Sequence, residues 1–127
     1  MFALAPLLAS LAVAVAAPAG TDLRITVWPN GPDETARHTW RLRCGPPGGT
    51  LPGARTACRR LGAIDRPFAP VPTDVACAEI YGGPQVARVT GGFEGRSVWA
   101  RFRRNDGCQI ARWNRMRFLF PVRTGTR

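Results

Sequence analysis

The sequence has no lysine, only one histidine (His38) and only two serines, Ser10 and Ser97. Catalysis by a serine or cysteine nucleophile requires a base, most often a histidine, within hydrogen-bonding reach. Ser97 falls inside a segment with the alternating pattern of a β-strand, and no motif places a nucleophile beside His38. We therefore expect no enzymatic activity and no catalytic residue in this chain.

Charged residues are absent from the start of the chain as far as Asp22, and residues 2–17 are almost wholly apolar. This run is short and rich in alanine, and small residues close it at Val15-Ala16-Ala17. Such a pattern is typical of a secretory signal peptide rather than a membrane span, with a buried N-terminal helix as the alternative. We expect residues 1–17 to be a signal peptide, 22–120 one domain and 121–127 a C-terminal tail. The mature protein would then be extracellular and free of the membrane.

The ligand spacing of a zinc site is also missing. The four cysteines contain no C-x-x-C pair, and one histidine cannot complete a ligand set with them. We expect no metal and no other cofactor. An even number of cysteines in a small secreted chain is instead typical of a disulfide framework, and four cysteines allow three pairings. We favour the sequential pairing, Cys44–Cys58 and Cys77–Cys108, because each bond then closes a local unit.

All 18 basic residues are arginine, and the net charge is +10. Arginines interleaved with aromatic residues are one signature of nucleic-acid binding. The residues with this character are Arg101, Arg103, Arg104, Arg112, Trp113, Arg115 and Arg117. We favour a solvated strand face, because arginines alternate with apolar residues from Trp99 to Arg103. A complete lack of lysine beside abundant arginine is also typical of a GC-rich genome, so we expect no specific nucleic-acid partner.

Alternating apolar and polar residues predict an antiparallel sheet. Its predicted strands are residues 23–27, 38–44, 85–90, 96–104 and 116–120. Ala54, Ala57, Cys58 and Leu61 share one face of a helix that is predicted to begin near residue 52 and to end before Gly62. Residues 65–73 are predicted to be irregular, 75–81 extended and 91–95 a hairpin turn. The fold class is α+β: a five-stranded, mainly antiparallel sheet with one or two helices packed on one face and two disulfides.

The segment from residue 44 to 61 resembles the signature of the Streptomyces subtilisin inhibitor family, C-x-P-x-x-G-x-H-P-x-x-x-x-A-C-x-x-L. The signature is met by Cys44, Pro46, Gly49, Pro52, Ala57, Cys58 and Leu61. A second family pattern, Asp-Val-x-Cys-x-x-x-Tyr, is met by Asp74, Val75, Cys77 and Tyr81. The resemblance extends from about Leu23 to Phe120 and includes an aromatic C-terminal strand at Phe118 and Phe120.

This resemblance implies a secreted, substrate-like inhibitor of subtilisin-type serine proteases. In such inhibitors a rigid loop occupies the protease cleft as a substrate does, while the protease supplies the catalytic groups. Carried over by position, the bond presented to the protease is Glu79–Ile80, and the flanking contact residues are Ala76, Cys77, Ala78 and Tyr81. The resemblance also implies the Cys44–Cys58 and Cys77–Cys108 bonds and a homodimer formed through the sheet.

Four departures from the family pattern stand out. Leu51 replaces the histidine of the signature. Glu79 stands where the family more often has Met, Lys or Arg. Burying an unpaired carboxylate in an apolar specificity pocket is unfavourable. A protease that accepts acidic residues is therefore an expected partner. Gly82-Gly83 replaces a single residue, which predicts a looser loop, and Asp106 replaces an asparagine that braces the loop. Tyr81 has two interpretations, protease contact and core packing.

The alternative function is a non-inhibitory secreted module whose arginine-rich face binds a polyanion or a component of the cell envelope. Ionic strength distinguishes the two functions. Binding of a polyanion falls steeply with salt, whereas binding of a loop buried in a protease cleft is much less sensitive to it.

Overall fold

A computed structural model describes residues 3–10 and 20–123 of the chain. Residues 3–10 have no regular secondary structure, and Leu4, Leu7 and Leu8 are fully exposed or nearly so. The alternative of a buried N-terminal helix is therefore wrong for this segment. The residues predicted to close the signal peptide, Val15-Ala16-Ala17, and residues 124–127 of the predicted tail lie outside the described residues. In the part of the chain that is described, no helix has the length and hydropathy to cross a bilayer.

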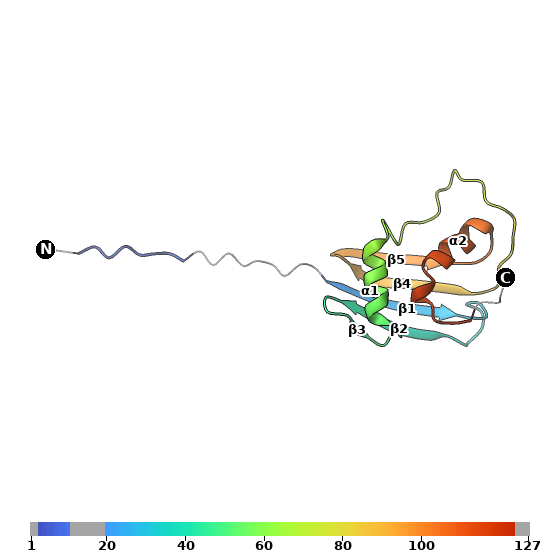
Figure 1. Cartoon of the computed structure of the whole chain (residues 1–127), viewed down its shortest axis with the longest axis horizontal. Coiled ribbons are helices and arrows are strands. Elements are labelled where there is room, and N and C mark those ends of the chain that lie inside the picture. Colours follow the sequence, from blue (N-terminus) through green and yellow to red (C-terminus); the bar gives the residue numbers. More distant parts are fainter. Residues whose placement is uncertain (1–2, 11–19, 124–127) are drawn as a thin grey trace.

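Five antiparallel strands form one sheet in the order β3-β2-β1-β4-β5 (Figure 1). Along the chain they are β1 (Thr21–Trp28), β2 (His38–Cys44), β3 (Gly48–Gly49), β4 (Val86–Phe93) and β5 (Arg96–Phe102). In the central strand β1, Ile25 lies opposite Trp40 of β2 and Val89 of β4. The predicted fold class and the pairing of the first two strands are confirmed.

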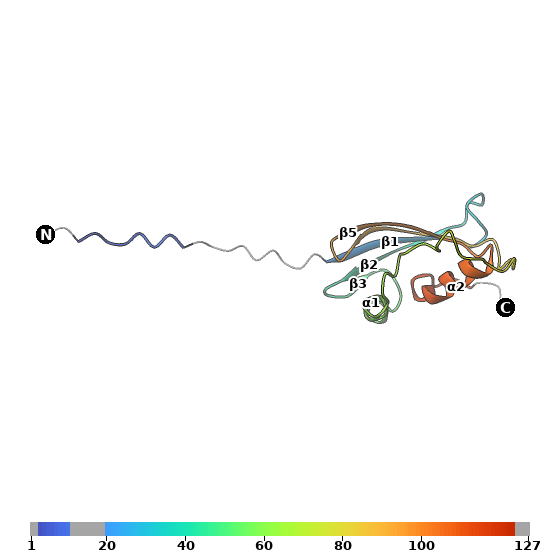
Figure 2. The ribbon, with the colours of Figure 1, turned by 90° about the horizontal axis from the view of Figure 1, so that it is seen from above.

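Two helices cover the same face of this sheet, as Figure 2 shows. The first, α1 (Ala54–Ala63), buries Ala57 and Leu61, while Ala54 and Cys58 are partly buried beside them. The predicted apolar face of this helix is confirmed. Gly62 does not end the helix, because Ala63 is still helical and the chain first becomes extended at Ile64.

The prediction of a strand at residues 116–120 is wrong. The chain forms a second helix, α2 (Gly107–Arg115), and then one turn of 3-10 helix, η1 (Arg117–Leu119). Asp106 begins α2, because its Oδ1 accepts a hydrogen bond of 2.9 Å from the backbone N–H of Gln109. A short apolar run fits a strand and a buried helical turn equally well. Here the chain stays coiled after α2, because the N–H of Met116 bonds back to the carbonyl oxygens of Arg112 and Trp113. The fifth strand is instead the two-residue β3, which is too short to show any alternation.

The β4–β5 hairpin is tighter than predicted. β4 continues through Gly91 and Gly92, which were expected in the turn, and only Glu94 and Gly95 connect the strands. Both connecting residues have positive φ angles, 49° and 82°, as a type I′ turn requires. β5 ends at Phe102, two residues earlier than expected.

The core lies between the sheet and the helices. Its side chains with no exposed surface include Leu23, Ile25 and Val27 of β1, Leu42 of β2, Val89 of β4, Phe102 of β5 and Trp113 of α2. The opposite face of the sheet, called here the outer face, carries exposed arginines at Arg24, Arg41, Arg43, Arg88 and Arg101, as the strand register places them. These are the solvated arginines that the alternation predicted.

Candidate functional site

The connection between α1 and β4, residues 64–85, is called here the α1–β4 loop. It extends away from the sheet beside β5 and α2 before it returns to the start of β4 (Figure 1). Near its far end Ile80 is 57% exposed and Tyr81 70% exposed, and Glu79 and Ala78 are exposed as well. Core packing of Tyr81 is therefore wrong. The segment predicted to contact a protease is therefore exposed around Glu79, and two large apolar side chains, Ile80 and Tyr81, follow this carboxylate along the chain.

The start of the loop is fixed by the buried side chain of Arg112, which projects from α2. Its Nε donates to the carbonyl oxygen of Ala69 (3.0 Å), and its Nη2 to that of Phe68 (3.4 Å). A third bond, of 2.6 Å, runs from Nη1 to the carbonyl oxygen of Arg101 in β5. The guanidinium carbon also lies 4.0 Å from the centre of the Phe102 ring. One side chain thus joins the helix, the sheet edge and the loop.

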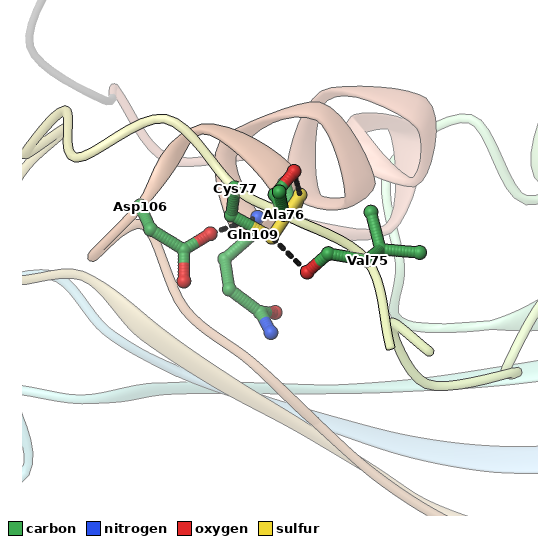
Figure 3. The surroundings of a disulfide bond; sticks show 6 residues. Val75, Ala76, Cys77, Asp106 and Gln109 are labelled. Carbon is green, nitrogen blue, oxygen red and sulfur yellow. Dashed lines mark hydrogen bonds between the residues drawn. A yellow bond between two sulfur atoms is a disulfide. The ribbon is translucent and has the colours of Figure 1, made fainter. Parts of the chain in front are cut away.

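The middle of the loop is fixed by the predicted disulfide Cys77–Cys108, whose Cα atoms are 5.3 Å apart. Cys108 lies in the first turn of α2, so the bond ties the loop to that helix (Figure 3). The sulfur of Cys77 lies 3.7 Å from the carbonyl oxygen of Val75, and that of Cys108 lies 3.8 Å from the carbonyl oxygen of Ala76. A disulfide sulfur carries no proton, so these are packing contacts. The other predicted disulfide, Cys44–Cys58, also forms and joins β2 to α1.

The carbonyl oxygen of Ala78 accepts two backbone hydrogen bonds. One comes from the N–H of Gly107 at the start of α2, and the other from the N–H of Ile80, both at 2.9 Å. The second bond closes a three-residue turn centred on Glu79, so the predicted extended segment is interrupted at that residue. Asp106 was expected to matter through its side chain, yet that side chain caps α2, and the backbone of the next residue contacts the loop.

The end of the loop is fixed to Arg104. The backbone N–H of Gly82 donates to the carbonyl oxygen of Arg104 (2.7 Å), and the Nε of Arg104 donates back to the carbonyl oxygen of Gly82 (3.2 Å). The Nη1 of the same guanidinium donates to Oδ1 of Asn114 in α2 (3.0 Å). The extra glycine was predicted to loosen this side of the loop. The structure instead attaches Gly82 at two points.

Arg104 and Arg112 are both buried, and neither has a carboxylate partner among the described residues. Arg104 is 2% exposed and Arg112 9% exposed, and the ion pair found in the described residues joins Arg41 to Asp22 on the surface. Burial lowers the pKa of Arg104 from its ordinary value, and the nearby charge of Arg117 lowers it further. Burial likewise lowers the pKa of Arg112, with a further effect from Arg115. Oxygens of the loop, β5 and Asn114 therefore solvate the two charges, which makes these contacts costly to break.

Comparison with known proteins bears on what such a loop is for. Residues 19–105 match the family model described as subtilisin inhibitor-like. The chain belongs to the subtilisin inhibitor-like family. No curated protein sequence matches it significantly. Among solved structures, sermetstatin of Streptomyces caespitosus in complex with Bacillus licheniformis subtilisin matches with a TM-score of 0.54 and 22% identity, over 82% of this chain and 100% of the other. At that identity the likeness shows the fold.

In this subtilisin inhibitor-like chain, family membership favours the inhibitor over the arginine-faced binding module. The structure adds a reason. Of the seven residues that suggested polyanion binding, Arg104, Arg112 and Trp113 are buried, so they cannot contact a polyanion. The family match ends at residue 105, before α2, so Cys108 and Arg112, which hold the start and the middle of the loop, lie beyond the matched residues, whereas Arg104 lies within them.

The loop-holding arginines were missed as functional residues at the level of sequence. Arg112 and Cys108 are four positions apart, so on a helix they share a face and point toward the same loop. Asp106 is a residue type favoured just before the first turn of a helix, and this is the signal that could have located α2. For Arg104 the sequence holds no comparable signal, because its partner Gly82 is distant along the chain.

Proposed function

We propose that this protein is a secreted, substrate-like inhibitor of subtilisin-type serine proteases and that it presents the bond Glu79–Ile80. The observation that carries the proposal is an exposed tip between two partly buried points of attachment. Glu79 and Ile80 are exposed, whereas the loop is held before and after them by Cys77 and Gly82. A peptide ordered before binding avoids an entropy cost of about 1 to 2 kcal/mol for each residue that would otherwise be fixed in the cleft.

The position of the disulfide explains how such a loop would resist permanent cleavage. Cys77 lies before the proposed bond and Cys108 after it, so a cut between Glu79 and Ile80 leaves the two parts covalently joined. The new chain ends stay close to each other, and the acyl-enzyme can re-form the peptide bond instead of losing its leaving group. The protease provides the Ser-His-Asp groups and the oxyanion hole, and we propose no catalytic group in the inhibitor itself.

The side chain of Glu79 points to the class of protease. A specificity pocket lined by apolar side chains would have to bury the carboxylate unpaired, whereas a pocket with a basic group would pair it. We therefore infer that the preferred partner is an extracellular serine protease that accepts acidic residues, and that ordinary subtilisin is inhibited more weakly.

A titration of the oxidised mature protein tests this proposal. The panel is subtilisin, trypsin, chymotrypsin and a glutamate-specific endopeptidase, with mass spectrometry to locate any cut. Tight inhibition with slow, single cleavage between Glu79 and Ile80 supports the proposal. Rapid degradation, or no binding to any of the four, contradicts it. Tight inhibition with cleavage at another bond would refute the assignment of Glu79–Ile80 as the reactive bond, while the inhibitory function would stand.

Secretion follows from the same proposal. The apolar residues 2–17 and two disulfides fit export to an oxidising compartment. Expression of the full chain in a secreting host, followed by N-terminal sequencing of the exported protein, should give a mature chain that begins shortly after Ala17. A retained, uncut chain would contradict this prediction.

We also infer self-association through the outer face, which family resemblance suggests. Trp99 lies on this face and is 69% exposed, an unusual exposure for so large an apolar side chain. The arginines of the same face would repel each other across a two-fold axis, so salt should strengthen the dimer. Sedimentation equilibrium at low and high salt, with Trp99→Arg as a disruptive variant, checks this. A monomer at both salt concentrations would contradict it.

A further inference from the structure

The stretch between the proposed bond and β4, residues 80–85, depends on Arg104 for its position. Two backbone N–H groups of this stretch form hydrogen bonds outside regular structure: that of Ile80, to Ala78, and that of Gly82, to Arg104. The bond from Ile80 to Ala78 joins residues on opposite sides of the proposed cut, so we expect it to be lost once the chain is cut. Gly82 remains held, because Arg104 binds it through its own backbone carbonyl and through its side-chain Nε.

The surroundings of this Arg104–Gly82 pair fit a fixed position. The guanidinium is buried, is bonded to Asn114, and lies 5.8 Å from the centre of the Trp113 ring. Gly82 is closely surrounded as well, since a Cβ at this residue would lie 2.7 Å from side-chain carbons of Ile110. A larger residue would have to displace the Ile110 side chain and would also crowd the carbonyl oxygen of Arg104, which lies 3.0 Å from the same position. Gly82, which follows the exposed tip, is thus held against Arg104 and Ile110.

We propose that Arg104 is a positioning residue that keeps the amine of Ile80 near Glu79 after the loop has been cut, and so favours resynthesis of the bond. The proposal rests on the proposed inhibitory function. In the resynthesis step the Ile80 amine attacks the acyl carbon of Glu79, which is esterified to the protease serine. The carbon–oxygen bond of the ester breaks, and a proton from the amine passes through the protease histidine to the serine oxygen.

The size of the effect follows from the length of the tether. With the pair intact, two residues, Ile80 and Tyr81, separate the cut from a fixed point at Gly82. Without it, the fixed point moves back to Val86 at the start of β4, and six residues lie in between. Effective concentration falls roughly as the −3/2 power of tether length, so a threefold longer tether lowers it about fivefold. The equilibrium ratio of cut to intact inhibitor should rise by the same factor of about five.

The experiment measures that ratio with a catalytic amount of whichever panel protease cuts Glu79–Ile80, starting from intact and from cut protein. The variants are Arg104→Met, Gly82→Ala and the two combined. Arg104→Met removes the bond from Nε to the carbonyl oxygen of Gly82 and leaves the backbone bond without that support, whereas Gly82→Ala crowds the backbone bond itself. Each should raise the ratio, by up to about fivefold, and the combination should raise it no further than Gly82→Ala alone, because both variants disrupt one pair. Gly82→Ala provides the test if Arg104→Met does not fold.

A stability control separates positioning from general weakening of the fold. Ile25→Val removes a methylene from a fully buried side chain of the central strand β1 and lowers thermal stability without removing a bond of the Arg104–Gly82 pair. It should leave the ratio of cut to intact protein unchanged. An equal rise in Ile25→Val, or an unchanged ratio in both Arg104→Met and Gly82→Ala, would overturn the proposal.

Amide hydrogen exchange distinguishes failure of this proposal from failure of the proposed function. The Gly82 amide donates to Arg104 in the intact protein, so its exchange can be followed by NMR without any protease. Arg104→Met keeps the backbone carbonyl that accepts this bond but removes the Nε bond that holds Gly82 against it, so exchange at Gly82 should accelerate about tenfold while the amides of β1 stay protected. If no protease is inhibited but this acceleration occurs, the inhibitory function fails and the role in resynthesis fails with it, while the attachment of Gly82 by Arg104 is still established. If inhibition occurs and Gly82 exchange is unchanged, the positioning role fails alone.

Discussion

The two disulfides close loops of different length, and only one of them crosses the proposed reactive bond. Cys77–Cys108 spans 31 positions and Cys44–Cys58 spans 14. In the chain-entropy treatment, replacing the first pair by serine lowers the free energy of unfolding by about 4 kcal/mol, and replacing the second lowers it by about 3 kcal/mol. The two double variants are therefore close to each other in lost stability and can serve as a matched pair.

Their effects on inhibition should differ strongly. Without Cys77–Cys108, the three residues before Glu79, Ala76 to Ala78, must be ordered when the protease binds. At about 1 to 2 kcal/mol per residue this weakens the complex by about 100-fold or more. Without Cys44–Cys58, the helix α1 is loosened from β2, but every contact of the loop itself is kept, so the inhibition constant should change little wherever the protein remains folded.

The assay combines urea denaturation with inhibition of a protease that the parent protein inhibits. A gel run with and without reductant adds a second readout. Cut parent protein should separate into two fragments only under reduction, and the Cys77→Ser/Cys108→Ser variant should separate without it. Equal loss of inhibition in both double variants would show that stability, and not the ordering of the loop, controls binding. An unchanged inhibition constant in Cys77→Ser/Cys108→Ser would refute the rigid-loop reasoning itself.

Three further predictions concern single residues. Glu79→Leu should tighten subtilisin binding at least tenfold, because burial of a leucine side chain contributes about 1.5 to 3 kcal/mol and the desolvated charge is removed. Glu94→Gln, in the β4–β5 hairpin, is the charge control. An unchanged inhibition constant in Glu79→Leu would place Glu79 outside the specificity pocket. Asp106→Ala should cost about 1 kcal/mol in urea denaturation, because the N–H of Gln109 loses its cap, whereas Asp106→Asn should be nearly neutral. Leu51→His restores the family signature but places an imidazole where the side chain is 3% exposed, so it should destabilise the fold by at least 1 kcal/mol; an equally stable variant would contradict the core position of this residue.

Local sequence patterns were sufficient to predict most strands of the sheet. Residues 38–44 alternate cleanly, and the strand observed there has those bounds, because one of its faces is buried and the other solvated. The C-terminal segment was predicted wrongly, since its apolar side chains are too few to define a period. The hairpin was predicted too wide, because glycines at 91 and 92 resemble a turn, yet Gly91 lies within the sheet, where an added Cβ would collide with the carbonyl oxygen of Asp22.

The sequence by itself determined the positions of the cysteines, the apolar face of α1 and the register that makes Glu79–Ile80 the proposed bond. These features depend on neighbours in the chain or on a short motif. Only the tertiary structure decided what Arg104 and Arg112 do. In the sequence alone they resemble solvated surface charges, and their partners in the loop, Gly82 and Ala69, lie 22 and 43 residues away along the chain. A hydrogen bond of that range forms only after the sheet and α2 have met, so no local pattern can reveal it.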